Sequence, residues 1–211
     1  MIIATSLEDA HAYGDIIPSI YKLRYQAFIA RQNYDVPTYK NMEYDAYDTP
    51  ATVYLAWRDN ENVVRGCTRL SPTDRPYMIK DIWPETVTSV ALPHSPDVWE
   101  ASRFCIDKHL PTEQRRRIHG ELLCAFQEFC LHQDIKWMIG VMSHPIWRFV
   151  FIKNGWPIEY LGPPKTLDNE PVIIAGKMPV SLAILERLRN VFNIYGNVLD
   201  CNTELFFQKV A

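Results

Sequence analysis

Apolar residues recur along the chain at intervals that predict an alternation of helices and strands. Between residues 15 and 31 they recur every three or four positions, which predicts an amphipathic helix. Similar spacing predicts helices over residues 112–133, 144–153 and 180–192. We expect Thr112 to cap the first of these, and Asn154-Gly155 to end the second in a left-handed turn.

Shorter apolar segments, rich in β-branched and aromatic residues, predict strands. They cover residues 52–58, 63–70, 98–106, 137–142, 158–161 and 172–177. A polar turn joins the first two as a hairpin, whereas residues 77–83 fit either a strand or a helix. Because the hairpin is antiparallel while later strands alternate with helices, the pattern predicts an α/β fold with a mixed β-sheet flanked by helices.

Two segments carry polar residues that regular structure does not explain. Residues 32–50 lack a sustained period and read as a long loop, and ordered loops of this length are usually functional. In the strand 98–106, regular alternation would put Glu100 and Ser102 on one face and Arg103 on the other. A β-bulge or a splayed strand pair would bring all three to one site.

Composition narrows the class of protein. With 211 residues, 47% of them hydrophobic, the chain most simply forms a single domain over residues 1–211, without repeats or linkers. Its net charge of −3 argues against nucleic acid as a partner. No apolar stretch is long enough to cross a membrane, and the first residues do not resemble a secretory signal.

Cysteine and histidine usage indicates the compartment and argues against a metal. The five cysteines are odd in number and include no C-x-x-C pair, which favours free thiols in a reducing cytoplasm. The six histidines are scattered, and none pairs with a cysteine at ligand spacing, so we expect no zinc site. The sequence therefore predicts a cytoplasmic protein.

A set of charged and aromatic residues in the first half of the chain is the main candidate for chemistry. Charges beside large aromatic rings are costly to bury unless they pair with one another or with a charged ligand. Acids and arginines together with aromatics would suit a zwitterionic small molecule. The set is Arg24, Phe28, Tyr34, Asp45, Asp48, Arg69, Glu100, Ser102 and Arg103.

In order and spacing, this set resembles the acyl-homoserine-lactone synthase family of bacterial quorum sensing. The resemblance covers roughly residues 20–180, and the one clear departure is Tyr34, where the family usually has tryptophan. It implies a GNAT-like α-β-α sandwich. It also implies an enzyme that transfers an acyl group from acyl-carrier protein or acyl-coenzyme A to the amine of S-adenosylmethionine. Lactonisation would then release methylthioadenosine, and no cofactor would be needed.

The resemblance assigns roles to the set. Asp45 and Asp48 would hold the positive groups of S-adenosylmethionine, although acids in a polar loop are ordinarily turn-capping residues. Arg24, Arg69 and Arg103 would bind its carboxylate or stabilise the acids. Phe28 and Tyr34 would stack on adenine or face the sulfonium, and for Phe28 an ordinary core role is equally open.

Glu100 is the candidate base, with Arg103 and Asp48 as the other candidate catalytic residues. Its neighbours Trp99 and Phe104 would desolvate the carboxyl group and raise its pKa. The nucleophile would be the substrate's own α-amine. No G-x-S-x-G motif surrounds Ser102, so we expect that hydroxyl to form hydrogen bonds or line the acyl pocket.

Two further groups concern the acyl donor. The acyl pocket would comprise Ser102, Trp137, Met142, Ser143, Trp147 and Phe151, of which the apolar members could equally be core. Gly140 stands where the family often has a small hydroxyl residue in enzymes for 3-oxo chains, so we expect a compact or branched chain without that group. Arg115, Arg116, Arg117, Arg148 and Lys153 would contact an acidic carrier protein or coenzyme A phosphates.

The sequence also allows a phosphate-binding segment and two alternative activities. Residues 117–122 partly resemble the loop with which GNAT enzymes cradle a pyrophosphate at a helix start, although the second small residue is missing. A GNAT-type N-acetyltransferase using acetyl-coenzyme A is one alternative activity. A non-catalytic S-adenosylmethionine-binding regulator is the other, and the Glu100, Ser102 and Arg103 set favours catalysis over it.

Overall fold

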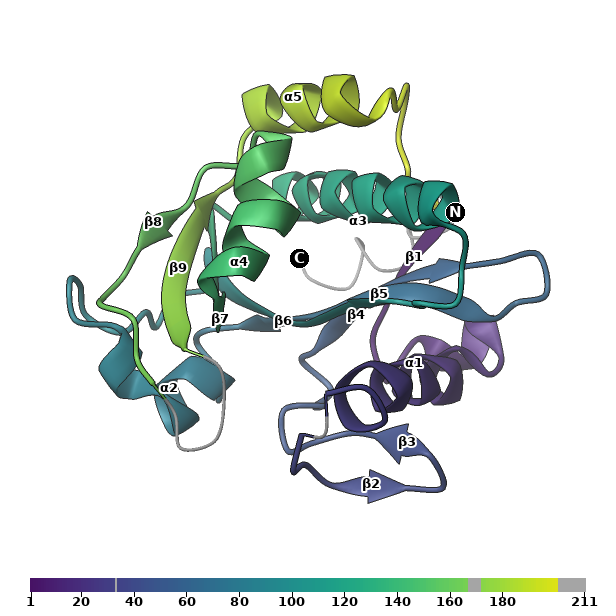
Figure 1. Ribbon diagram of the computed structural model, residues 1–211, viewed down its shortest axis with the longest axis horizontal. Coiled ribbons are helices and arrows are strands. Elements are labelled where there is room, and N and C mark those ends of the chain that lie inside the picture. The colour runs from purple at the N-terminus through teal and green to yellow at the C-terminus, as the bar shows by residue number, and fades with distance from the viewer. Residues whose placement is uncertain (33, 167–171, 201–211) are drawn as a thin grey trace.

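A mixed β-sheet with helices on both faces forms the structure, a computed structural model that describes residues 1–32, 34–166 and 172–200 (Figure 1). The seven-stranded sheet has the order β1-β4-β5-β6-β7-β9-β8. Its strands are β1 (Ile2–Thr5), β4 (Val53–Arg58), β5 (Val64–Pro72), β6 (Val98–Ile106), β7 (Trp137–Ser143), β8 (Glu159–Tyr160) and β9 (Ile173–Pro179). Within this sheet only β6 and β7 pair in parallel.

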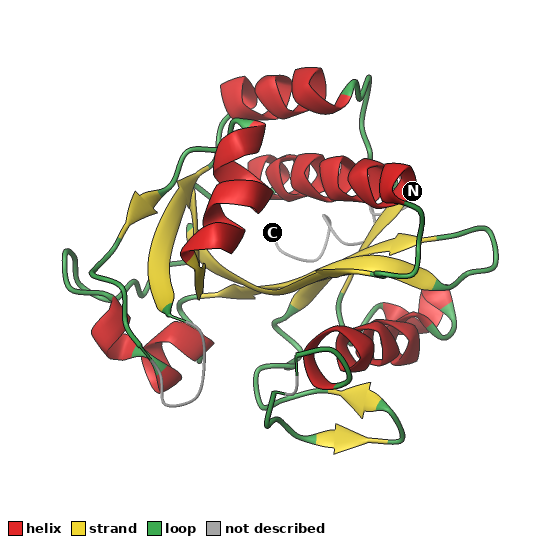
Figure 2. Ribbon diagram, viewed as in Figure 1, coloured by secondary structure: helices red, strands yellow, loops and turns green. Residues whose placement is uncertain are grey.

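The helices lie on both faces of the sheet (Figure 2). One face carries α3 (Thr112–His132), α5 (Leu182–Phe192) and a segment that begins with α4 (His144–Ile146). The other face carries α1 (Ile16–Arg24) and α2 (Met78–Ile82). Single 3-10 turns occur at Ala10–Tyr13, Pro84–Thr86 and Ile152–Asn154. Together the layers form the predicted α-β-α sandwich.

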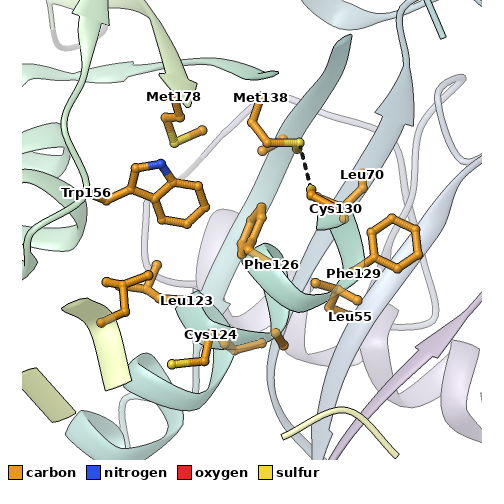
Figure 3. Packing of buried hydrophobic residues seen from close by; sticks show 14 of the residues in the cluster. Leu55, Leu70, Leu123, Cys124, Phe126, Phe129, Cys130, Met138, Trp156 and Met178 are labelled. Atoms are coloured by element: carbon orange, nitrogen blue, oxygen red, sulfur yellow. Dashed lines mark hydrogen bonds between the residues drawn. The ribbon is translucent and has the colours of Figure 1, made fainter. Parts of the chain in front are cut away.

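The main hydrophobic core lies between the sheet and α3. Phe126, Phe129 and Cys130 project from α3 toward Leu55, Leu70 and Met138 of the strands (Figure 3). A second core packs α1 against β4, β5 and β6, and a third packs Ile79 of α2 against Ile139 of β7. Because apolar clusters fill both faces, the sheet is a rigid support for side chains that project from its strand ends. No helix in the described part of the chain is long and apolar enough to cross a membrane.

Most predicted elements are confirmed, and the differences lie at helix ends and in the loop. The helix predicted over residues 15–31 is α1 followed by a π-helical turn at Tyr25–Ile29. The predicted loop contains a short hairpin of β2 (Thr38–Tyr39) and β3 (Met42–Glu43), whose strands are too short to show a period. Residues 78–82 form the helix α2. Thr112 is the first residue of α3 rather than its cap, a position that Pro111 occupies.

The segment after β7 is helical but irregular. α4 continues into a π-helical turn at Trp147–Phe151 and then a 3-10 turn, which Gly155 ends with φ 92° as predicted. Residues 117–122 lie inside α3 rather than in a loop at its start. Because these residues follow the first turn of α3, their backbone N–H groups donate within the helix. They are not free to bind a phosphate as the N–H groups of a GNAT pyrophosphate loop are.

Two irregularities in the sheet shape the functional region. The β5–β6 register shifts between Cys67 and Arg69, and Arg103 lies at the shift with a left-handed φ of 55°. In addition, β6 pairs with β7 only from Val98 to Glu100, after which the two strands have no pairing. The structure thus contains both devices that the sequence suggested, a bulge and a splayed pair.

Candidate functional site

A cluster of buried charges lies between α1, the β2–β3 hairpin and the bulged strands β5 and β6. At its base the Arg24 side chain, fully buried at the end of α1, binds two acids. Its Nε donates to Glu43 Oε2 at 2.5 Å, and its Nη1 and Nη2 donate to both oxygens of Asp48 at 2.7 and 3.0 Å. Asp48 also accepts from the Tyr54 hydroxyl at 2.7 Å and from the backbone N–H of Asp45 at 2.7 Å.

Asp45 joins the other two arginines. Arg69 Nη1 donates to Asp45 Oδ1 at 2.5 Å, and Arg103 Nη2 donates to Asp45 Oδ2 at 2.7 Å. Arg103 Nε also donates to Glu43 at 3.1 Å, while Arg69 Nε donates to the Ser102 hydroxyl at 2.9 Å. Because of the bulge, the consecutive residues Ser102 and Arg103 both reach this cluster.

The cluster balances three guanidinium groups against the carboxylates of Glu43, Asp45 and Asp48. Although burial alone would raise it, the Arg24 guanidinium lowers the pKa of Asp48 to about 2. The same acids raise the pKa of Arg24 against the effect of burial. Among the described residues, no group of three or more His, Cys, Asp or Glu side chains could hold a metal ion. Its guanidinium and carboxylate groups offer partners for the anionic and cationic groups of a zwitterionic ligand.

Glu100 lies next to this cluster but is held differently. Its carboxylate accepts the backbone N–H groups of Met78 and Ile79 at 2.9 and 2.7 Å, at the start of α2. Glu100 is only 2% exposed. Burial raises the pKa of its carboxyl group more than the two backbone hydrogen bonds lower it, so the pKa is about 7. Arg103 forms its ion pairs with Glu43 and Asp45 rather than with Glu100, so the carboxylate of Glu100 does not serve to hold Arg103.

A thioether sulfur lies against two of the arginines. Met78 Sδ accepts from Arg69 Nη2 at 2.9 Å and lies 3.7 Å from Arg103 Nη1. A thioether is a weak acceptor, so these two guanidinium groups keep N–H donors that no carboxylate of the described residues engages. They are the donors best able to bind an incoming anion.

The aromatic residues of the set lie at the same place. Phe28 and Tyr34 stack with ring centroids 5.8 Å apart, and the Arg103 guanidinium lies 5.5 Å from the centre of the Phe28 ring. Phe28 is 9% exposed, so it both packs in the core and forms a wall of the site. The π-helical turn that holds Phe28 adds a residue to the helix, a feature frequent at functional sites.

The structure divides the residues predicted for the acyl pocket. Met142, Trp147 and Phe151 lie with the core on the α3 face, where the Trp147 indole donates to the Ile174 carbonyl at 2.9 Å. Trp137 starts β7, far from Met142 along the strand and on the alternate face, where Lys177 covers its ring. Ser143 ends β7 on that same alternate face.

One correction and one further observation concern this group. Ser102 belongs to the charged cluster rather than to the apolar residues, because the bulge directs its hydroxyl toward Arg69. Gly140 of β7 pairs with Gly176 of β9. A Cβ atom added at Gly140 would lie 3.5 Å from the Trp147 ring, and one added at Gly176 would lie 2.8 Å from it. The glycine pair therefore accommodates the indole within the sheet surface.

The predicted basic residues occupy the α3 face. Arg115 and Arg117 are engaged locally, Arg115 with the Leu110 carbonyl and Arg117 with Glu121. No carboxylate pairs with Arg116, Arg148 or Lys153 within the part of the chain that the structure describes. Arg148 and Lys153 flank the ring of Phe149, which is 57% exposed.

Three residues of the site were missed from the sequence: Glu43, Tyr54 and Met78. Glu43 had a signal, since it lies two residues before Asp45 in the same loop. Tyr54 and Met78 had none, because each reads as an ordinary apolar position of a strand or a short helix.

Comparisons with known proteins show the family of this chain. Residues 10–188 match the family described as Autoinducer synthase. An acyl-homoserine-lactone synthase of Aeromonas hydrophila is 33% identical over 162 residues, which are 75% of this chain and 77% of the relative. Among solved structures, the CoA-dependent acyl-homoserine lactone synthase BjaI, with SAM and isopentyl-CoA, matches with a TM-score of 0.85 and 27% identity over 95% of this chain and 92% of that one.

A more distant likeness concerns the fold alone. A structure from Lactobacillus plantarum, described as a "putative N-acetyltransferase", matches with a TM-score of 0.53 at 18% identity, covering 85% of this chain and 98% of that chain. This confirms the GNAT-like architecture. The family match covers most of the sequence and sets aside the two alternative activities. The chain belongs to the autoinducer synthase family and is an acyl-homoserine-lactone synthase that uses S-adenosylmethionine and an acyl thioester.

Proposed function

We propose that the charged cluster binds S-adenosylmethionine and that Glu100 is the base for acyl transfer. The observation that carries this proposal is the contrast among the acids. Glu43, Asp45 and Asp48 are each bound by arginines, whereas the hydrogen bonds that Glu100 accepts from the described residues come from backbone N–H groups, and its pKa is about 7. A carboxylate of that pKa can accept a proton from an ammonium group near neutral pH.

The substrate's carboxylate binds the guanidinium donors that now face Met78. These are Arg69 Nη2 and Arg103 Nη1, which together offer two converging N–H groups. Its ammonium group then lies toward Glu100 and Asp45, and Phe28 and Tyr34 provide the aromatic face for adenine or the sulfonium. Arg24, Glu43 and Asp48 do not touch the substrate in this arrangement; they hold Arg103 and Asp45 in place.

Acyl transfer follows from this arrangement. Glu100 takes a proton from the α-ammonium, and the free amine attacks the thioester carbonyl. The amide forms as the C–S bond breaks, and the expelled thiolate takes up the second amine proton and leaves as the thiol. In the second step a carboxylate oxygen of the same substrate attacks its own γ-carbon. The C–S bond breaks, and its electron pair leaves with the sulfur as methylthioadenosine. Proximity and the polar surroundings supply most of the acceleration.

The acyl donor approaches from the α3 face where β6 and β7 separate. Pairing between these strands ends at Glu100 and Ile139, so the base lies at the point of separation. Met142, Trp147 and Phe151 lie beyond it on that face. Trp147 is fully buried over the Gly140–Gly176 pair, which supports a compact or branched acyl chain.

The carrier of the acyl group binds the basic residues of the α3 face. Arg116, Arg148 and Lys153 have no carboxylate partner among the described residues, and exposed Phe149 lies between two of them. This surface suits the acidic face of acyl-carrier protein and the phosphates of coenzyme A alike. The cytoplasm supplies both donors, and free buried thiols at Cys67 and Cys105, 3.6 Å apart, agree with a reducing compartment.

The test uses purified protein with S-adenosylmethionine and isovaleryl groups carried by coenzyme A or by acyl-carrier protein. Mass spectrometry should detect isovaleryl-homoserine lactone and methylthioadenosine in equal amounts with at least one donor. An Arg148→Glu/Lys153→Glu variant should raise the KM for that donor and leave the KM for S-adenosylmethionine unchanged. Equal donor kinetics in this variant would contradict the carrier surface, and a changed KM for S-adenosylmethionine alone would contradict the assignment of the two binding regions.

A further inference from the structure

A cavity lies between α1 and the outer ends of β5 and β6, away from the charged cluster. It has a volume of about 320 Å³, which is at the lower end of the range for small-molecule sites. The cavity is lined by Val64 of β5 and Ile106 of β6, whereas the charged cluster contains Arg69 of β5 and Ser102 of β6. The five-residue separation along β5 corresponds to about 16 Å at the rise of a strand. The cavity therefore belongs neither to the substrate site nor to its acyl entrance on the α3 face.

The lining of this cavity is amphipathic. Its floor consists of Leu23 of α1, Ala27 of the π-helical turn that follows, Val64 of β5 and Ile106 of β6. Leu23, Ala27 and Val64 belong to the core that packs against β4, β5 and β6, and Ile106 packs against the main core, so the floor is already formed without a ligand. An occupant would have to bring apolar surface to replace water there.

The rim of the cavity is positive. Lys22, Arg31 and Lys108 line it, are exposed, and take part in no ion pair recorded for the described residues. The one carboxylate of the lining, Asp107, is already bound by Arg65 at 3.0 Å, and Arg65 is bound in turn by Asp59 at 2.7 Å. The rim thus concentrates uncompensated positive charge on a chain whose net charge is −3.

From this combination we infer that the cavity is a binding site for a small organic anion with an apolar body, separate from both substrate sites. The apolar part occupies the floor, and the anionic head lies among Lys22, Arg31 and Lys108. Inorganic phosphate alone would leave the floor hydrated, and a neutral molecule would leave the cations without a partner. A cavity of this size holds a small molecule rather than a macromolecular surface.

The test is titration calorimetry of the full chain with octanoate, a carboxylate with an apolar chain. Octanoate should bind at one site, whereas octan-1-ol and inorganic phosphate should each bind at least tenfold more weakly. The Arg31→Glu/Lys108→Glu variant should lose at least tenfold in octanoate affinity. Lys22→Ala is a milder second variant that should lose severalfold. The matched control is Lys136→Glu, an exposed lysine outside the cavity, which should bind octanoate as the wild type does.

A competition experiment separates this inference from the proposed substrate site. Saturating S-adenosylmethionine should leave the octanoate affinity unchanged, and failure of the synthase assay would leave this result unaffected. Absence of octanoate binding, equal binding in the charge-reversal variants, or displacement by S-adenosylmethionine would each overturn the inference. Equally tight binding of phosphate or octanol would also overturn it, because the site would then not require both features.

Discussion

Replacing Asp48 by asparagine tests whether this residue supports the site rather than binding substrate directly. Asp48 is almost fully enclosed, with a side chain 3% exposed, and both of its oxygens accept from the buried Arg24. Asparagine retains the size but removes the charge and turns one acceptor into a donor facing a guanidinium or N–H group. Arg24 would then be a buried cation with Glu43 as its remaining close partner.

The magnitude can be worked from the structure. The pKa of Asp48 falls from 3.8 to about 2, which corresponds to about 2 kcal/mol of stability in the ionised form. Breaking a buried ion pair by removing one partner costs about 3–5 kcal/mol, since the other charge stays buried. Asp48→Asn should therefore lower the free energy of unfolding at pH 7 by about 3–5 kcal/mol.

Urea denaturation measures this loss of stability, and repeating it at several pH values shows whether the loss depends on the charge of Asp48. Because the folded-state pKa of Asp48 is lowered, its contribution is complete above about pH 4 and is lost as the pH falls toward 2. The difference between wild type and Asp48→Asn should shrink over that interval. The matched control is Asp134→Asn, at an acid whose side chain is 94% exposed, and it should stay within about 0.5 kcal/mol of wild type. A destabilisation by Asp48→Asn below about 1 kcal/mol at every pH would refute the reasoning.

Three further predictions concern the walls and the base of the site. Tyr34→Trp should keep S-adenosylmethionine use nearly unchanged, while Tyr34→Ala should raise the KM because Phe28 loses its stacked partner; equal tolerance of both would place Tyr34 outside the site. Glu43→Gln should destabilise the fold by about 3 kcal/mol in urea denaturation, since Glu43 is fully buried between two guanidinium groups, and an unchanged midpoint would contradict its role. Gly176→Ala should cost about 1–3 kcal/mol in the same assay, because its Cβ would lie 2.8 Å from the Trp147 ring, and a neutral effect would show that the indole can move.

The sequence predicted the sheet, the main helices and the charged set because these depend on local periodicity and on residue order. The strand 98–106 is a clear case: alternation alone showed that Glu100, Ser102 and Arg103 could not share a face without an irregularity, and the structure has a bulge there. The two-residue strands of the β2–β3 hairpin could not be predicted, since so short a segment has no measurable period.

Side-chain partners were harder to predict than elements. The sequence did not indicate that Glu100 would accept N–H groups from α2, because that contact joins residues more than twenty positions apart. Nor could it place Trp137 and Ser102 apart from the apolar residues near Met142 and Trp147, since strand register and the bulge decide which face each occupies. Such contacts depend on tertiary packing, which local pattern does not encode.

The structure also defines what a Glu100 variant must control for. Glutamine at this position can accept from only one of the Met78 and Ile79 N–H groups, so a loss of about 1–3 kcal/mol in stability is expected. Binding of S-adenosylmethionine should persist, because Arg69, Arg103 and Asp45 remain. Calorimetric titration with S-adenosylmethionine and circular dichroism check both points before any rate is compared.

The pH dependence of acyl transfer in wild type and Glu100→Gln tests the central claim most directly. In the wild type, kcat/KM for S-adenosylmethionine should rise through the Glu100 pKa of about 7 and then level off. In Glu100→Gln the rate at pH 7 should fall by roughly a hundredfold or more. Part of that loss should return as the pH approaches the amine's own pKa, about 8. Wild-type turnover in a folded Glu100→Gln variant across the whole pH range would contradict the assignment of Glu100 as the base.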